Sequence, residues 1–102
     1  MDITPELLQA FKDRMHISHS GEDDNLEELL SFSCAYVEGK CGSFDLVSKS
    51  SLDLRAKELV LERTRYAYND AVEYFEDNFL SEINSLGLDM VFAKEGDEIE
   101  GV

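Results

Sequence analysis

The stretch LDLRAKELVLERTRYAYNDAVEYFEDNFLSEINSLGLDM, residues 52–90, decides the fold of this chain. Its apolar residues recur every three or four positions, which is typical of helices with one buried face. One helix face consists of Leu52, Ala56, Leu59, Val60, Arg63 and Ala67, apolar except for Arg63, and a second stripe consists of Val72, Phe75, Phe79, Ile83, Leu86 and Met90. We predict helices near residues 52–68 and 70–90. The pair Asn69-Asp70 either separates them or lies within one helix.

The N-terminal residues predict a short capped helix near residues 5–15. Thr4 is suited to cap it, because its side-chain oxygen can accept a hydrogen bond from a free backbone N–H of the first turn. Pro5 follows at a position where its missing N–H costs nothing. The apolar face of this helix consists of Leu7, Leu8, Phe11 and Met15.

A further helix is predicted near residues 22–40. Either Ser20 or Asp23 is expected to serve as its N-cap, and Gly42 is expected to end it. The helical stripe expected to face the core consists of Leu26, Leu29, Leu30, Ser33, Val37 and Cys41. The Ser-rich segment GSFDLVSKSS, residues 42–51, has no apolar period and is predicted to be the main loop.

These patterns predict an all-α fold, a small helical bundle of about four helices. The predicted core residues are Leu7, Leu8, Phe11, Leu26, Leu29, Leu30, Val37, Leu59, Val60, Phe75, Phe79 and Ile83. Residues 1–92 are assigned to the helical domain and residues 93–102 to a flexible acidic C-terminal tail. The hydrophobic residues of this tail are Ala93, Ile99 and Val102, too few to hold it on the domain.

Charge is the most informative feature of the composition. The 102 residues include 9 basic and 23 acidic side chains, for a net charge of -14. Such a surface as a whole repels nucleic acid and anionic membranes. Residues 70–102 hold ten acids and one base, whereas four of the nine bases lie close together, at Arg55, Lys57, Arg63 and Arg65. Patches of opposite sign suit a contact between unlike surfaces of neighbouring subunits.

The sequence carries no membrane or export signal that we recognise. No apolar run approaches the roughly 18 residues of a membrane span, and the N-terminus lacks the basic start and apolar block of a signal peptide. Cys34 and Cys41 are predicted to be reduced thiols in a cytosol. They lie about 10 Å apart along one predicted helix, so we expect them not to share a metal ion with His16 and His19.

One motif raises the possibility of a covalent cofactor. The sequence SSLDLRAKELVLE, residues 50–62, resembles the Asp-Ser-Leu site of acyl carrier proteins, where a serine at a helix start carries phosphopantetheine. However, Ser50 stands in place of the Asp, and the helix that follows is basic rather than acidic. We therefore interpret Ser51 as an ordinary N-cap and keep a carrier module as an alternative. In the absence of a phosphate loop or a nucleophile motif, we predict neither an enzyme nor a cofactor.

Aromatic residues crowd the middle of residues 52–90, at Tyr66, Tyr68, Tyr74, Phe75 and Phe79. Residues two positions apart on a helix point about 200° apart, so these rings cannot all occupy one face. We predict that most belong to the core and that some contact a partner, because tyrosine is enriched at interfaces.

Three segments together resemble a known family. They are TPELLQAFKDRM (4–15), DDNLEELLSFSCAYVEGKCG (23–42) and RAKELVLERTRYAYNDAVEYFEDNFLSEINSLGLDM (55–90). The shared motifs are an Asp-Asp-x-Leu helix start, a Tyr-Val-Glu helix end and an Arg-Tyr-x-Tyr-Asn segment. In these the chain is similar, over roughly residues 3–92, to head–tail connector proteins (head completion or adaptor proteins) of long-tailed double-stranded DNA phages, most of all those of Gram-positive hosts. It departs from the family at Ser33-Cys34, where alanine is usual.

The resemblance implies a place and a set of partners. Connectors of this family form a ring, commonly of twelve subunits, that binds beneath the portal protein at the head–tail interface of the virion. The ring extends the DNA channel without sequence-specific binding and provides a docking platform for a stopper or tail-completion protein. A C-terminal arm reaches into the portal, and residues 88–102 match it here. Before assembly such a protein is in the host cytoplasm.

The candidate interface combines the basic cluster, two tyrosines and the apolar residues of the C-terminal segment. Its members are Arg55, Lys57, Arg63, Arg65, Tyr66, Tyr68, Leu88, Met90, Phe92, Ile99 and Val102. A second alternative function follows from charge alone: so acidic a chain is also suited to inhibit a basic protein.

Overall fold

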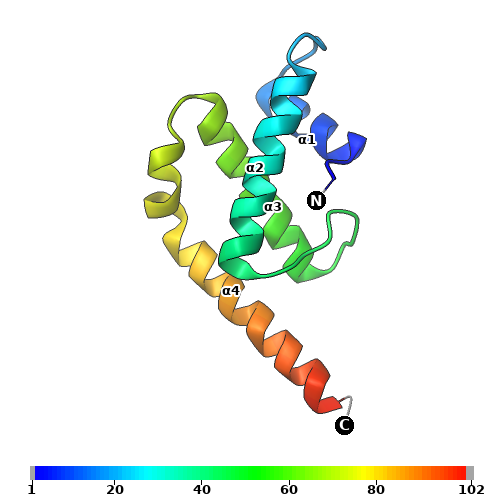
Figure 1. Ribbon diagram of the computed structural model, residues 1–102, viewed down its shortest axis with the longest axis vertical. Coiled ribbons are helices and arrows are strands. Elements are labelled where there is room, and N and C mark those ends of the chain that lie inside the picture. Colours follow the sequence, from blue (N-terminus) through cyan, green and yellow to red (C-terminus); the bar gives the residue numbers. More distant parts are fainter. Residues whose placement is uncertain (1, 101–102) are drawn as a thin grey trace.

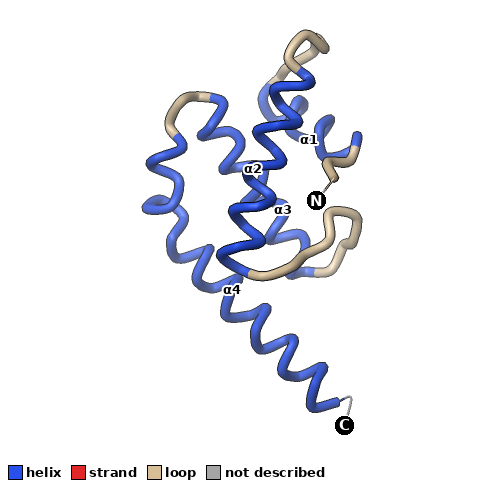
Figure 2. The backbone as a smooth tube through the Cα atoms, in the orientation of Figure 1, coloured by secondary structure: helices blue, strands red, loops and turns tan. Residues whose placement is uncertain are grey.

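The computed structural model describes the backbone of residues 2–100 and the side chains of residues 2–94. Four α-helices make up the fold, and the described residues contain no strand (Figures 1 and 2). They are α1 (Pro5–Met15), α2 (Asp23–Cys41), α3 (Ser51–Tyr68) and α4 (Phe75–Glu100), with a short 3-10 helix η1 (Val72–Tyr74) before α4. The predicted all-α class and the four-helix organisation are confirmed.

The first helix begins as the sequence predicts. The Thr4 side chain accepts a hydrogen bond from the backbone N–H of Leu7 at 3.1 Å, and Pro5 is the first helical residue. At the other end, His16 adopts a left-handed conformation with φ 58°, and its N–H bonds to carbonyl groups of the last turn. This arrangement ends α1 and turns the chain toward α2.

Two of the predicted caps are wrong. Neither Ser20 nor Asp23 is the N-cap of α2, since Glu22 occupies that position without a side-chain cap bond. In α3 the cap is Ser50 and not Ser51: the Ser50 hydroxyl accepts from the N–H of Asp53 and donates to the Asp53 carboxylate at 2.8 Å. Both errors are shifts of a residue or more at a helix boundary, where several small polar residues compete for the same role.

The turn between α3 and α4 resolves the alternative at Asn69-Asp70. Asn69 is the C-cap of α3, and Asp70 has a left-handed φ of 56° that redirects the chain. Aspartate tolerates this conformation better than most residues. The predicted end of the last helix near residue 90 is wrong, because α4 continues to Glu100. The backbone of residues 93–100 thus belongs to a helix, and the flexibility of the tail in the free protein stays a prediction.

The core lies where α3 packs against the other three helices. In Figure 1, α2 and α3 cross at the centre, α1 covers one end of the pair, and α4 runs diagonally along the other side. Of the twelve predicted core residues, nine are buried: Leu7, Phe11, Leu26, Leu30, Val37, Leu59, Val60, Phe75 and Ile83. Leu8, Leu29 and Phe79 are only partly buried, which corrects the prediction for these three.

The core also contains residues that the predicted core omitted. Cys34, Cys41, Phe44, Ala56, Leu61 and Leu86 are all buried. Leu61 lies off the predicted stripe of α3, but α3 contacts three helices and therefore buries more than one face. Phe44 comes from the loop that was predicted to be aperiodic, and its burial anchors this loop on the bundle.

A charged cluster joins α1 to α3. Arg14 donates to Glu58 at 2.8 Å and to Glu62 at 3.0 Å, and Arg65 also donates to Glu62. Only 17% of the Glu62 side chain is exposed, and its hydrogen bonds from Arg65 and Arg14 lower the pKa of its carboxyl group. Glu58 is 57% exposed.

This cluster predicts a specific acid sensitivity. A carboxyl group with a lowered native pKa stabilises the fold above its unfolded pKa of about 4.3, and this contribution is lost as the pH falls through the native pKa. We expect Glu62→Gln to reduce the free energy of unfolding by about 1 kcal/mol at pH 7. The difference from the parent protein should shrink as the pH falls from about 5 toward 3.

Urea unfolding at several pH values measures this effect. Glu58→Gln is the matched control, since it removes a carboxylate that also pairs with Arg14 but is well exposed. Its effect should be smaller at every pH, because exposed ion pairs contribute little. An equal effect of the two substitutions, or a Glu62→Gln difference that does not change with pH, would contradict the assignment.

Candidate functional site

The C-terminal half of α4 projects from the body of the molecule. Figure 1 shows the orange and red part of the helix beyond the last residues of the other helices. The molecule is accordingly elongated, with extents of 51, 28 and 17 Å. The last close contacts with the body are near residues 87–90, where an added methyl group on Gly87 would lie 3.5 Å from the carbonyl oxygen of Lys40 and Asp89 pairs with Arg55. Past this region α4 presents most of its circumference to solvent.

An exposed apolar stripe runs along the solvent side of α4. It consists of Leu80, Leu88, Val91 and Phe92, which are 48%, 56%, 49% and 58% exposed. We call these four residues the outer stripe. Their spacing places them within about 120° of arc on the helix, away from the core residues Phe75, Ile83 and Leu86. Unlike single exposed hydrophobic residues, several on one face indicate an interaction surface.

The sequence located this surface only in part. Leu88 and Phe92 were predicted interface residues and do lie on the outer stripe. Met90 is half-buried, with its sulfur beside Gly42. The side chain of Ile99 and the whole of Val102 lie outside the described residues. The sequence analysis did not predict Leu80 and Val91 as interface residues. Both are apolar residues outside the core repeat of α4, and this position is the signal that would have identified them.

The predicted basic cluster does not form one open patch. Arg55 donates to Asp89 at 2.7 Å and to Ser85 at 3.2 Å, which fastens α3 to α4. Lys57 points about 200° away from Arg55 around the helix, is half-buried, and forms no ion pair within the described part of the chain.

The two remaining bases of the cluster also have partners inside the subunit. Arg65 pairs with Glu62 at 3.0 Å, and its guanidinium lies over the ring of Tyr66. Arg63 donates to Ser33 at 3.2 Å and stacks on the Tyr36 ring at 4.6 Å, and burial lowers the pKa of its guanidinium. Intramolecular partners therefore occupy the three arginines, and a role for the cluster in partner binding stays a prediction.

The tyrosines divide as the helical geometry requires. Tyr66 packs edge-on against Phe75 and Phe79. Tyr68 points to the other side, where its ring meets Phe11 at 6.2 Å and its hydroxyl donates to Glu22. Of the three, Tyr74 is the most exposed, at 59%, and is the ring most accessible to a partner.

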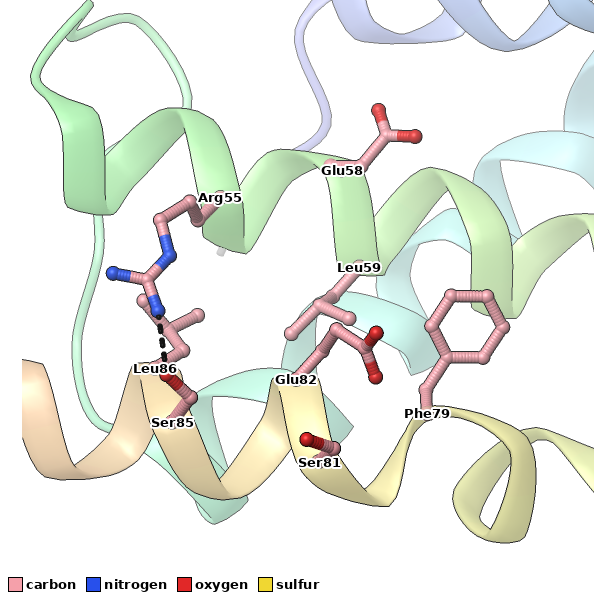
Figure 3. Close-up of a pocket in the computed structure, with 8 residues that line it drawn as sticks. All are labelled: Arg55, Glu58, Leu59, Phe79, Ser81, Glu82, Ser85 and Leu86. Atoms are coloured by element: carbon pink, nitrogen blue, oxygen red, sulfur yellow. Dashed lines mark hydrogen bonds between the residues drawn. The ribbon is translucent and has the colours of Figure 1, made fainter.

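A pocket of about 300 Å³ opens between α3 and α4 (Figure 3). Leu59, Phe79 and Leu86 form its apolar wall. Its other lining residues are polar or charged: Arg55, Glu58, Ser81, Glu82 and Ser85. The volume is at the lower end of the range for ligand sites, roughly 300–1,000 Å³, and suits a single large side chain better than a cofactor.

The residues considered for metal binding or chemistry are dispersed. Cys34 and Cys41 are buried, and burial raises the pKa of Cys34 to about 11 and raises that of Cys41, so neither is a reactive thiolate at neutral pH. His16 and His19 are exposed in the turn after α1. Within the described residues no three His, Cys, Asp or Glu side chains are grouped as metal ligands. Ser51 is exposed at the first position of α3.

The fold defines the chain as an all-α four-helix protein with a projecting C-terminal helix. None of the described helices is both long enough and apolar enough to cross a membrane. The chain matches no protein-family model, no curated protein and no solved structure.

Proposed function

We propose that this protein is a structural head–tail connector of a long-tailed double-stranded DNA phage. In this role it binds beneath the portal, extends the DNA channel and presents a docking platform for a stopper or tail-completion protein. The subunits associate into a ring in the virion. The resemblance in residues 3–92 motivates this proposal, and the all-α bundle is the fold that the resemblance implies.

The observation that carries the proposal is the projecting half of α4 with its outer stripe. A long helix that leaves the bundle and exposes Leu88, Val91 and Phe92 is suited to enter a groove of a partner through one apolar face. Residues 88–100 of this helix belong to the segment 88–102, which matches the family's portal-binding arm. The net charge of -14 also fits a channel protein, because an acidic surface repels the duplex and allows it to slide.

The alternative functions have weaker support. A carrier module needs a serine that an enzyme can reach, and Ser51 is exposed, but the basic residues of α3 remain unlike those of a carrier helix. Intact mass after treatment with a phosphopantetheinyl transferase distinguishes the two functions, since a carrier gains the prosthetic group at Ser51. An inhibitor of a basic protein fits the charge but gives no reason for the outer stripe.

The direct test is assembly with a portal ring. The full chain is mixed with the portal protein of a candidate phage of a Gram-positive host, and the mixture is examined by electron microscopy and sedimentation. We expect added density in a ring beneath the portal. If portals from several such phages bind no protein at micromolar concentration, the connector function is wrong.

Deletion of residues 93–102 tests the role of the tail. The shortened chain should keep its melting point, because all the buried core residues among the described side chains precede residue 93. It should lose portal binding, because the deletion removes the contacts that residues 93–102 make with the portal, and these contacts must outweigh the roughly 2–5 kcal/mol that ordering such a segment costs. Portal binding equal to that of the full chain would show that the tail is dispensable and that the contact lies on the helical body.

A further inference from the structure

The pocket between α3 and α4 combines an apolar wall with a carboxylate that has no cationic partner among the described side chains. Figure 3 shows Leu59 extending from α3 and the Phe79 ring extending from α4, with Glu82 directed from α4 toward α3 in the space between them. Phe79 is half-buried and Glu82 is exposed, so both are accessible from solvent. The pocket lies on a different side of α4 from the outer stripe.

The other charged groups of the rim are already neutralised. Arg55 is paired with Asp89 at 2.7 Å, and Glu58 turns away from the pocket to pair with Arg14 at 2.8 Å. No lysine, arginine or histidine among the described side chains forms an ion pair with Glu82. The pocket therefore presents one uncompensated negative charge next to an aromatic face.

This combination matches the chemistry of one kind of side chain. An arginine has an apolar stem that packs along aliphatic and aromatic surface, and a planar cation that stacks on a ring and pairs with a carboxylate. The volume of about 300 Å³ suits a single such side chain. The acidity of the whole molecule adds to the attraction, because a net charge of -14 draws basic partners to its surface.

We infer that this pocket is a docking site for an arginine side chain of a partner protein. The arginine stem lies between Leu59 and Phe79, and its guanidinium pairs with Glu82. This inference does not depend on the connector function, since it rests on the pocket alone. It assigns the protein a second contact surface, separate from the outer stripe and specific for a basic group.

Two short peptides test the inference directly. Acetyl-Ala-Arg-Ala-amide and the same peptide with citrulline, which has nearly the shape of arginine without its charge, are titrated into the ¹⁵N-labelled full chain. We expect the arginine peptide to shift the amide signals of residues around Phe79, Glu82 and Leu86. Its dissociation constant should lie in the millimolar range, and the citrulline peptide should bind about ten-fold more weakly or not at all.

Substitution identifies the carboxylate. Glu82→Gln should weaken binding of the arginine peptide about ten-fold and remove the preference over citrulline. Glu28→Gln, which changes an exposed carboxylate on α2, should leave the binding unchanged. Both variants should give the dispersed spectrum of the folded protein. Signal changes away from the pocket, equal binding of the two peptides, or unaltered affinity in Glu82→Gln would each overturn the inference.

Discussion

Truncation of Phe75 to alanine is expected to lower the free energy of unfolding by about 3–5 kcal/mol, the usual cost of removing a buried phenylalanine side chain. Phe75 is 1% exposed at the start of α4. Its ring stacks on Phe79 with centroids 4.7 Å apart and meets the edges of Tyr36 and Tyr66 at 6.0 and 5.6 Å. The substitution would therefore open a cavity where α2, α3 and α4 join.

This loss is large compared with the total free energy of unfolding of the domain. A domain of this length has a stability of about 5–15 kcal/mol, so the variant is expected to lose a large part of it. Urea unfolding followed by circular dichroism at neutral pH gives the value. Phe79→Ala is the control: Phe79 is only partly buried, and we expect a cost of about 1–3 kcal/mol. If Phe79→Ala costs more than Phe75→Ala, the aromatic cluster is not centred where the structure places it.

The second large effect is expected on partner binding. Replacing Leu88 and Phe92 together with serine should weaken binding to a portal ring about 100-fold or more, since apolar and aromatic anchors at interfaces commonly contribute 2 kcal/mol or more each. Both side chains are more than half exposed, at 56% and 58%. The stability of the isolated protein should therefore change by no more than about 0.5 kcal/mol. Sedimentation with the portal and a thermal melt measure the two quantities.

Phe32 provides a matched control for this variant. It is 57% exposed on α2, almost the same as Phe92, but it is not part of the outer stripe. Phe32→Ser should leave portal binding unchanged. If instead the Leu88/Phe92 variant binds as tightly as the parent protein while Phe32→Ser does not, the portal-binding surface is on α2 and not on α4.

Local patterns were sufficient for much of the fold. The three- and four-residue repeats located α1, α2 and α3 to within a residue or two, because each helix buries one continuous face. Gly42 was correctly predicted to end α2: it has a φ of 117°, a conformation that suits glycine. The N-cap residues were harder to predict. Positions 50 and 51 are both serine, and only the exact start of the helix decides which of them is the cap.

The candidate site was harder to predict, because it depends on what each side chain contacts. The basic residues of α3 are adjacent in sequence, but their partners Asp89, Ser33 and Glu62 come from three different helices. The apolar repeat of a helix also does not show how far that helix extends beyond the residues that pack against it. The exposure of Val91 and the opening beside Glu82 were for the same reason not apparent from the sequence.

The sequence by itself determined the all-α class, the number of helices and most of the core, because these follow from residue spacing and from the charge that keeps the remaining faces in water. The tertiary structure alone decided which charges neutralise one another, which of the tyrosines pack against the core, and that α4 projects with a second apolar face. Those properties depend on how close segments distant in the chain come to one another, and the periodicity of one helix carries no information about that distance.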